Sequence, residues 1–279
     1  MDTDALTDEV ASRFADTPDA RLKEIMTALV RHLHAFAREV RLGEDEWFRG
    51  IDFLTRTGQA CDAKRQEFIL LSDVLGLSMQ TVAINAGRAA DCTESTVFGP
   101  FHVPGAPHAE HGDDIARGAR GSPCVVRGRV RGTRGEAVQG ATIDVWQADD
   151  DGRYDVQKTG LDHAQARAVL HSRDDGSFEF RSIVPQPYPI PTDGPVGELL
   201  AATRRSAWRP AHLHFMIQAE GYERLITHVF RRGDPHLHDD PVFGVRRSLV
   251  ADWAVQPDGT ARLDFDFVLQ QTTSRDLGA

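Results

Sequence analysis

The hydrophobic pattern of the chain changes period near residue 123, and this change limits the folds open to it. Before that point, apolar residues over 22–40 recur at the three- and four-residue spacing of an amphipathic helix. After it, short apolar runs such as 125–130 and 177–183 are separated by Gly, Pro and Asp. The pattern predicts a helical region followed by a β-rich region without alternating helices, which favours an antiparallel sandwich.

The helical region is expected to occupy the first ninety or so residues. Thr17 can cap the first helix, with Pro18 at its first position. A second helix is predicted from Glu44 to Gly58, and 68–82 predicts a helix broken at Gly76, at a domain interface. Further strands are expected at 141–148, 211–219, 225–230 and 261–269. We therefore predict an α+β chain with a helical dimerisation domain over 1–100 and an antiparallel β-sandwich catalytic domain over 101–279.

Composition excludes several classes of protein. Hydrophobic residues make up 41% and charged residues 27% of the chain, as in soluble globular proteins, and the net charge of −10 argues against a nucleic-acid surface. The acidic N-terminus does not look like a secretory signal, and no apolar run is long enough to embed the chain in a membrane. Cys61, Cys92 and Cys124 show neither pairing nor metal spacing, so a reducing cytoplasm is expected.

Two histidines one residue apart, His212 and His214, indicate a metal site. Alternate side chains of a strand share a face, so both imidazoles can reach one point while Leu213 packs on the other side. Tyr154 follows an acidic turn after the expected strand 141–148, and Tyr188 lies in a Pro-rich loop. A trivalent cation strongly favours the phenolate form of tyrosine. Two phenolates and two imidazoles therefore suit ferric iron, Fe³⁺, at one ion per subunit.

Charge balance favours iron over zinc at this site. Fe³⁺ with two phenolates carries one positive charge, which one hydroxide neutralises, and a buried pocket tolerates a neutral site far better than a charged one. Each piece alone also has an ordinary structural explanation, such as a half-exposed strand or a packed tyrosine with a bonded hydroxyl. A zinc-binding module that uses His212 and His214, or a non-catalytic sandwich of the transthyretin type, therefore remains an alternative.

Four segments are similar to the intradiol ring-cleaving catechol dioxygenases. They are Glu-Ser-Thr-Val-Phe-Gly-Pro-Phe at 94–101, Asp-Val-Trp-Gln-Ala-Asp at 144–149, Asp-Gly-Arg-Tyr at 151–154 and Arg-Pro-Ala-His-Leu-His-Phe at 209–215. The stretch 181–200 resembles the hydroxyquinol branch more closely than the catechol branch. The resemblance covers nearly the whole chain. It implies an enzyme that cleaves hydroxyquinol, 1,2,4-trihydroxybenzene, with O₂ to 3-hydroxy-cis,cis-muconate and maleylacetate. A catechol or chlorocatechol 1,2-dioxygenase would share the same metal ligands and stays open.

The resemblance also assigns roles to residues. It implies that iron is held by Tyr154, Tyr188, His212 and His214. Tyr188 would in addition accept a substrate proton, Arg209 would stabilise the anion derived from the ring, and His228 would lie close to the iron without binding it.

Ten further residues are expected to line the substrate pocket by the same resemblance. They are Leu70, Asp73, Val97, Phe98, Gly99, Pro100, Phe101, Ile190, Pro191 and Val242. Asp73 is expected to accept a hydrogen bond from a third substrate hydroxyl, its alternative being a solvated position on a helix. Phe98 departs from the aliphatic residue expected at its position, which bears on the tolerance of ring substituents.

The helical region resembles the dimerisation linker of the same family. The apolar stripe over 22–40 is costly to leave in water, at about 25 cal/mol per Å² of apolar surface, so we expect a homodimer that buries it. In relatives this region encloses a hydrophobic tunnel that can hold a phospholipid. A bound phospholipid is therefore a further implication of the resemblance.

Overall fold

The structure is a computed structural model and describes residues 2–62, 65–86 and 91–272. The chain divides into two compact units, Met1–Arg56 and Thr57–Ala279. Helix α3 (Glu44–Gln59) runs from the first unit into the second. A functional boundary near residue 100 remains a prediction.

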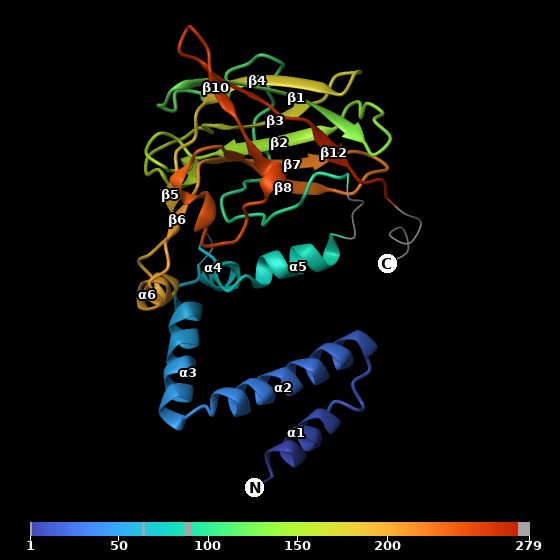
Figure 1. Cartoon of the computed structure of the whole chain (residues 1–279), viewed down its shortest axis with the longest axis vertical. Coiled ribbons are helices and arrows are strands. Elements are labelled where there is room, and N and C mark those ends of the chain that lie inside the picture. Colours follow the sequence, from blue (N-terminus) through green and yellow to red (C-terminus); the bar gives the residue numbers. More distant parts are fainter. Residues whose placement is uncertain (1, 63–64, 87–90, 273–279) are drawn as a thin grey trace. The chain divides into compact units, whose positions relative to one another are not determined.

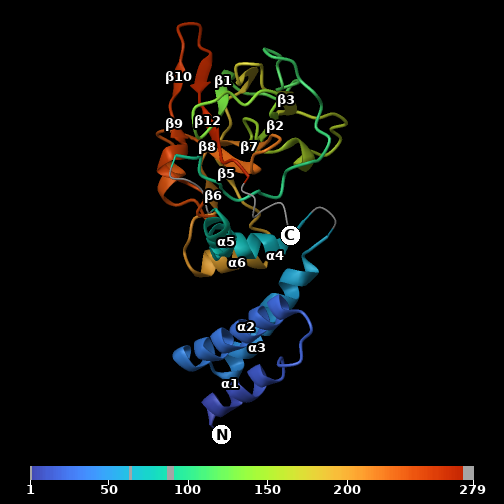
Figure 2. The same cartoon turned by 90° about the vertical axis from the view of Figure 1, so that its right-hand side faces the viewer.

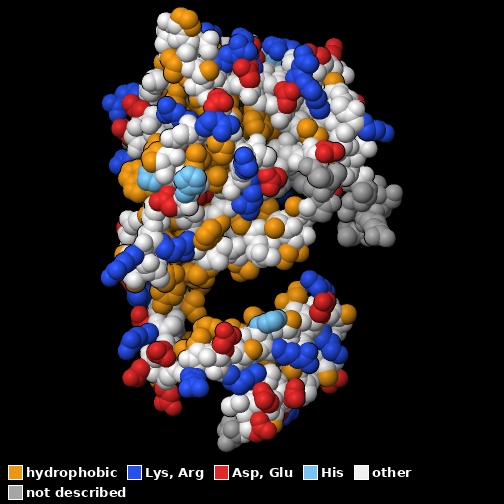
Figure 3. All heavy atoms as spheres, viewed as in Figure 1, with side chains coloured by type: hydrophobic (Ala, Val, Ile, Leu, Met, Phe, Trp, Pro, Cys, Tyr) orange, Lys and Arg blue, Asp and Glu red, His pale blue; other side chains and the backbone are white. Residues whose placement is uncertain are grey.

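The first unit is helical, as predicted. It contains α1 (Thr3–Ser12), α2 (Ala20–Val40) and most of α3. Helix α2 is capped by Asp19, whose carboxylate accepts hydrogen bonds from the backbone N–H groups of Arg21 and Leu22, so the cap expected at Thr17 was wrong by two residues. The apolar side chains of α2 and α3 gather on the surface of this unit (Figure 3). Leu33 and Phe36, for example, are 55% and 54% exposed.

Three short helices belong to the second unit. Helices α4 (Glu67–Val74) and α5 (Leu77–Asn85) are separated at Gly76, as the sequence predicted, and α6 (Pro195–Ala202) was not anticipated. Figures 1 and 2 show all three on one side of the strands. Single turns of 3₁₀ helix occur at η1 (Asp155–Gln157), η2 (Pro235–His238) and η3 (Arg247–Leu249).

No single helix in the described ranges is long and apolar enough to span a membrane, and only the bent pair α4 and α5 passes that test jointly.

The rest of the second unit is built from strands. In chain order they are β1 (Pro123–Gly132), β2 (Thr142–Gln147), β3 (Arg167–His171), β4 (Ser177–Ile183), β5 (Tyr188–Pro189), β6 (Trp208–Arg209), β7 (His212–Gln218), β8 (Leu225–Arg231), β9 (Val250–Ala251), β10 (Trp253–Val255), β11 (Ala261–Asp264) and β12 (Phe267–Leu269). Within the described residues they form two five-stranded sheets and a small pair, β5 with β6.

One sheet has the order β10-β11-β1-β12, with β4 also paired to β1, and the other has the order β3-β2-β7-β8-β9. One buried apolar cluster takes side chains from both sheets, including Phe178 and Phe215, so the sheets pack face to face as a sandwich. The pairing is mixed rather than antiparallel throughout. Strand β1 pairs in parallel with β11 and β12, and β8 with β9. The alternation of apolar residues reports which face of a strand is buried, but not the direction of its neighbour, so the sequence could not show this.

Candidate metal centre and substrate pocket

Strand β7 separates the sandwich core from the candidate site. Leu213 and Phe215 point into the core, whereas His212 and His214 lie on the opposite face of the same strand. Across the sheet, His214 pairs with Trp146 of β2 and with His228 of β8. Because directly opposed residues of antiparallel strands share a face, all three histidines lie on the outer face of this sheet.

Two tyrosines approach these histidines from outside the sheet. Tyr154 comes after the turn that follows β2, where its backbone N–H donates to Gln157 Oε1 at 2.9 Å. Tyr188 comes from β5, directly opposite Arg209 of β6. Both tyrosines are buried, at 1% and 4% exposure.

The four predicted ligands meet at one point. Tyr154 Oη lies 2.9 Å from His214 Nε2, 3.4 Å from His212 Nε2 and 3.3 Å from Tyr188 Oη. The two imidazole Nε2 atoms are 3.1 Å apart. Two ligands bound to the same metal at about 2.0–2.1 Å, with an angle of about 90–110° between them, are roughly 2.9–3.4 Å apart. The donor set therefore fits a single metal ion.

The protonation of these groups also fits a metal. His212 Nδ1 donates to the carbonyl oxygen of Pro210 at 2.6 Å, which leaves the lone pair of Nε2 free to point at the other donors. Burial lowers the pKa of His212 and of His214 well below the usual value, so both imidazoles are neutral. Burial raises the pKa of Tyr154 well above its usual value, with a further contribution from Tyr188. The phenol of Tyr154 therefore loses its proton only when a cation lies beside it.

His228 lies against the donor set, with its ring centroid 4.1 Å from that of His214. Burial, followed by the charge of Arg209, lowers the pKa of His228 well below its usual value. Its Nδ1 is hydrogen-bonded to Thr96 Oγ1, and its Nε2 has no partner among the described residues. A second possible set of metal ligands consists of three histidines, His212, His214 and His228. The ligand nitrogens of their rings all lie within 4.8 Å of one another.

The acidic run Asp149–Asp151 also brings three carboxylates together. Asp149 accepts hydrogen bonds from the backbone N–H groups of Asp151 and Arg153, and its other oxygen lies 2.6 Å from Lys158 Nζ. Arg120 pairs with Asp151 at 2.7 Å. These contacts are those of a capped and neutralised turn.

Arg209 is anchored by a residue that the sequence reasoning missed. Its Nε donates to Asp240 Oδ1 at 3.1 Å, and both side chains are 3% exposed. Burial acts to lower the pKa of Arg209, but the charge of Asp240, followed by that of Tyr188, outweighs it and the pKa is raised. Arg209 Nη1 donates to Tyr188 Oη at 3.4 Å, and Nη2 has no partner among the described residues. The pattern Asp239-Asp240-Pro241 alone could not show which aspartate is buried.

A cavity of about 20 Å³ is bordered by Tyr188 and Arg209. Its lining includes every predicted pocket residue except Phe98, namely Leu70, Asp73, Val97, Gly99, Pro100, Phe101, Ile190, Pro191 and Val242. Gly99 has a φ of +76°, and a Cβ there would lie 3.0 Å from His214 Cε1. A side chain at this position would therefore press on a predicted ligand as well as strain the backbone.

Phe98 is not among the residues that line either cavity, so its place in the substrate pocket stays a prediction. Its ring is 40% exposed and packs against His102 and Trp146, with centroid distances of 4.8 and 5.8 Å.

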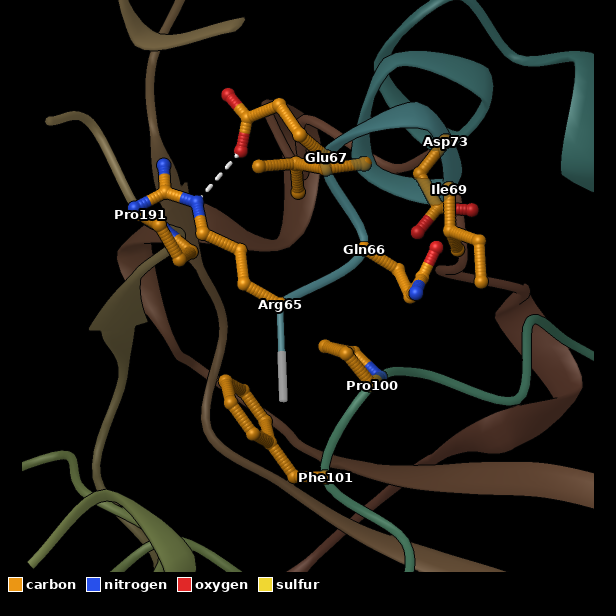
Figure 4. A pocket seen from close by; sticks show the side chains of 9 residues that line it. Arg65, Gln66, Glu67, Ile69, Asp73, Pro100, Phe101 and Pro191 are labelled. Atoms are coloured by element: carbon orange, nitrogen blue, oxygen red, sulfur yellow. Dashed lines mark hydrogen bonds and ion pairs between the residues drawn. The ribbon is translucent and has the colours of Figure 1, made fainter. Parts of the chain in front are cut away.

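A larger outer cavity of about 160 Å³ adjoins the first (Figure 4). The two share Leu70, Asp73, Pro100, Phe101 and Pro191, and the outer one is also lined by Arg65, Gln66, Glu67 and Ile69. Asp73 is only 4% exposed, so it is not a solvated helix residue. Burial raises the pKa of its carboxyl group, while a hydrogen bond from Ser78 and the charge of Arg209 oppose that shift.

Comparison with known proteins identifies the family. Residues 97–271 match the family described as Dioxygenase, and residues 19–93 match Catechol dioxygenase N terminus. The chain belongs to the intradiol ring-cleavage dioxygenases. It is 68% identical over 267 residues to the 6-chlorohydroxyquinol 1,2-dioxygenase of Cupriavidus pinatubonensis, which covers 96% of this chain and 97% of the relative. It is 53% identical to the hydroxyquinol 1,2-dioxygenase of Rhodococcus opacus, over 95% of this chain and 92% of the relative.

A solved structure shares the fold of this dioxygenase. The crystal structure of hydroxyquinol 1,2-dioxygenase from Pseudomonas putida superposes with a TM-score of 0.91 at 46% sequence identity, and the match covers 97% of this chain and 99% of the other. The family implies non-haem iron, which agrees with the two-tyrosine, two-histidine donor set.

Proposed function

We propose that this dioxygenase cleaves hydroxyquinol between its two adjacent oxygenated carbons, and that Tyr154, Tyr188, His212 and His214 hold one ferric ion. The observation that carries the proposal is the convergence of these four donors, 2.9–3.4 Å apart in the pairs that touch. They lie in a chain that is 68% identical to one named for a chlorinated hydroxyquinol.

The overall reaction needs no external reductant. The chemistry that ferric iron supplies when bound is the withdrawal of electron density from the coordinated ring, so that a ring carbon can react with O₂. One carbon–carbon bond breaks, O₂ is reduced by the electrons of the ring, and both oxygen atoms enter the product. Hydroxyquinol, C₆H₆O₃, thus becomes hydroxymuconic acid, C₆H₆O₅, which tautomerises to maleylacetate.

The side chains around the cavity bind the substrate and manage its protons. Tyr188 Oη, in its phenolate form, would accept a hydroxyl proton from the substrate. Arg209 remains a cation, its Nη2 has no partner within the part of the chain that the structure describes, and it lines the cavity, so it would donate a hydrogen bond to the ring-derived anion. His228 would remain a neutral neighbour of the donor set.

Asp73 is the residue that we propose to select hydroxyquinol over catechol. Its buried carboxylate would accept a hydrogen bond from the third hydroxyl, which catechol lacks. Hydrogen bonds to charged groups contribute about 1.5–3 kcal/mol, equivalent to roughly ten- to hundredfold in selectivity.

The specificity experiment compares kcat/KM for hydroxyquinol and catechol in the wild type and in Asp73→Asn. Wild type should prefer hydroxyquinol, the substitution should narrow that preference, and the visible spectrum should not change. Asp45→Asn, the same change at an exposed carboxylate of α3, serves as the control. A wild type that prefers catechol contradicts the substrate assignment, whereas an unchanged ratio in Asp73→Asn contradicts only the role of Asp73.

The metal is tested separately by colour and elemental analysis. Protein expressed with ample iron should be wine-red from phenolate-to-iron charge transfer and contain one iron per chain. Tyr154→Phe should lose both the metal and the colour, because its hydroxyl lies closest to a histidine donor. Stoichiometric zinc without a visible band would instead support a zinc module built on the three histidines.

A chlorinated hydroxyquinol is a second candidate substrate, favoured by the name of the relative at 68% identity. The outer cavity of about 160 Å³ offers space for a ring substituent. Turnover of 6-chlorohydroxyquinol in the same assay decides whether the substrate range includes it.

We also infer a homodimer that buries the apolar face of α2. Leu22, Ile25 and Leu29 are 45–47% exposed in the single chain, which is costly in water at roughly 25 cal/mol per Å² of apolar surface. A monomer in light scattering at micromolar concentration would contradict this.

All three cysteines lie in the described residues and none forms a disulfide, which supports the cytoplasmic location we infer. A bound phospholipid stays a prediction from the family resemblance.

A further inference from the structure

An ion pair with a buried carboxylate lies at the wall of the outer cavity and takes no part in the chemistry proposed above. Glu67, the first residue of α4, is completely buried. Its Oε2 accepts a hydrogen bond from Arg65 Nε at 2.9 Å, drawn as the dashed line in Figure 4. Both side chains line the outer cavity.

The same carboxylate also holds the beginning of α6. Glu67 Oε1 accepts a hydrogen bond at 3.1 Å from the backbone N–H of Val196, in the first turn of that helix. A negative charge at a helix N-terminus is favourable, because the first backbone N–H groups have no partner within the helix. Glu67 therefore ties the first turn of α4 to the first turn of α6.

The connection leaves no space for a side chain at Gly194, which precedes α6. A Cβ at Gly194 would lie 2.5 Å from Arg65 Nη2 and 2.6 Å from Glu67 Oε1. Its φ of −128° is accessible to any residue, so only the close approach of the ion pair requires glycine here.

The segment held in this way is part of the substrate pocket. It begins at Tyr188, carries Ile190 and Pro191 in the cavity wall, and ends at Gly194. Pro191 lines both cavities and lies only three residues before Gly194. On the other side of the outer cavity are residues of α4, among them Ile69. Glu67 Oε1 joins the two sides through the backbone N–H of Val196, and Arg65, two residues before Glu67 in the chain, fixes the direction of that carboxylate. The distance between the two walls therefore depends on how Glu67 is oriented.

The carboxylate of Glu67 is buried, whereas the Arg65 side chain is 28% exposed. Pairing a buried carboxylate is a weak device for stability alone, since well-packed apolar residues often do as well, but loss of Arg65 would leave an unpaired buried charge. The geometry of the pair is specific, however, because the guanidinium and the carboxylate meet in fixed directions. Arg65 also pairs with Asp193 Oδ1 at 2.8 Å, but that carboxylate is 75% exposed and the contact is expected to contribute little.

We propose that Glu67, oriented by Arg65 and bonded to the backbone N–H of Val196, is a positioning latch that sets the width of the outer cavity and so determines which ring substituents this dioxygenase admits. The latch acts through the 188–194 segment rather than by touching the reacting atoms. The kinetic test of this inference, described below, rests on the proposed function, whereas the test by ligand binding does not.

Two variants loosen the latch by different means. Glu67→Gln keeps an oxygen that can accept the hydrogen bond from the Val196 N–H. Its amide NH₂ then faces Arg65 Nε, so Arg65 loses both its hydrogen-bond acceptor and the negative charge that holds the guanidinium in place. Gly194→Ala keeps every charge and forces the pair and the segment apart by the close contacts of its Cβ. Asp193→Asn removes the exposed partner of the same arginine and is the matched control.

The kinetic readout is the ratio of kcat/KM for hydroxyquinol to that for a hydroxyquinol bearing an ethyl group. A pocket discriminates one extra methylene by about 10- to 200-fold, so loosening the wall should reduce this ratio by about tenfold in both variants and leave it unchanged in Asp193→Asn. A role in stability alone would lower the active fraction for both substrates equally and leave the ratio constant, which would overturn the proposal.

The binding readout does not depend on turnover. Phenol and 4-ethylphenol lack the second hydroxyl needed for cleavage, so calorimetry can measure their dissociation constants without turnover. The preference for phenol over 4-ethylphenol, given by the ratio of these constants, should decrease in both variants. If wild type fails to cleave hydroxyquinol, the proposed function fails while the phenol ratios still decide the latch. If Glu67→Gln does not fold, Gly194→Ala decides alone, and an unchanged phenol ratio there refutes the latch.

Discussion

Replacing Asp240 by asparagine should disable Arg209 while leaving the metal donors in place. Asp240 uses both carboxylate oxygens, since Oδ1 accepts from Arg209 Nε at 3.1 Å and Oδ2 accepts from the backbone N–H of Gly244 at 2.9 Å. Asparagine has one acceptor oxygen, so its amide NH₂ must face either the guanidinium or the N–H of Gly244. At least one buried hydrogen bond is lost in either orientation, and two are lost if the amide faces the guanidinium, because the backbone N–H of Val242 also donates to Oδ1 at 3.4 Å.

The size of the effect follows from burial. Both side chains of the pair are 3% exposed, so solvent cannot replace the lost carboxylate charge. Breaking a buried pair by removing one partner costs about 3–5 kcal/mol. We expect the amide to recover part of this and the net loss of folding stability to be about 3 kcal/mol. Without its anchor, Arg209 would spend less time in the orientation that faces the substrate, and kcat/KM should fall by about a hundredfold, or about 2.7 kcal/mol.

The adjacent Asp239 provides a matched control. Its side chain is 50% exposed and pairs with His236 at 3.4 Å, so Asp239→Asn should stay within about twofold of wild type in kcat/KM. The assay measures urea unfolding, iron content and kcat/KM for each variant. If Asp240→Asn retains kcat/KM within about threefold of wild type, Arg209 does not depend on this anchor and the reasoning is wrong.

Two further predictions concern Gly99 and Cys124. Gly99→Ala should weaken iron retention against a chelator by about tenfold, since its Cβ would press on His214, whereas Gly105→Ala, at the same φ of +76° with open space around it, should retain iron. Burial raises the pKa of the Cys124 thiol from 9.0 to about 12, so in the folded protein at pH 8 it should resist alkylation that it undergoes in urea. Between about pH 9 and 12 the unfolded thiol loses its proton while the folded one keeps it, so urea titrations should show stability falling, relative to Cys124→Ala, by up to about 1.4 kcal/mol per pH unit.

The sequence predicted those parts of the structure that depend on local signals. The helix at Glu44, the break at Gly76 and the strand 177–183 follow from spacing and turn residues, and all three are present. Family resemblance predicted four metal donors and ten pocket residues, of which nine border the inner cavity. The ring of Phe98 packs against His102 and Trp146 instead, because the resemblance gives positions along the chain but not the direction of each side chain.

What the sequence could not show are contacts between residues that are far apart in the chain. Glu67 meets Val196 and Arg65 meets Asp193 more than a hundred residues later, and Arg209 meets one of two adjacent aspartates. The parallel partners of β1 come from the last strands of the chain, 137 residues downstream in the pairs Cys124–Ala261 and Val130–Phe267. No periodicity within a single segment encodes these pairs, because each is selected by the packing of the whole unit.

The charges around the inner cavity are arranged to orient an asymmetric triol. Asp240 lies behind Arg209 and neutralises most of its cost of burial, so the guanidinium can remain as a fixed donor beside Tyr188. Asp73 borders the same cavity from α4, and burial raises the pKa of its carboxyl group, which makes it a better acceptor of a hydroxyl proton than an exposed carboxylate. We expect a diol to meet only the donor, whereas a triol placed with its extra hydroxyl toward α4 would meet both. An orientation of hydroxyquinol that satisfied this pair while its adjacent hydroxyls faced the four predicted metal donors would be favoured, and this is the physical reason to expect selectivity from the inner cavity.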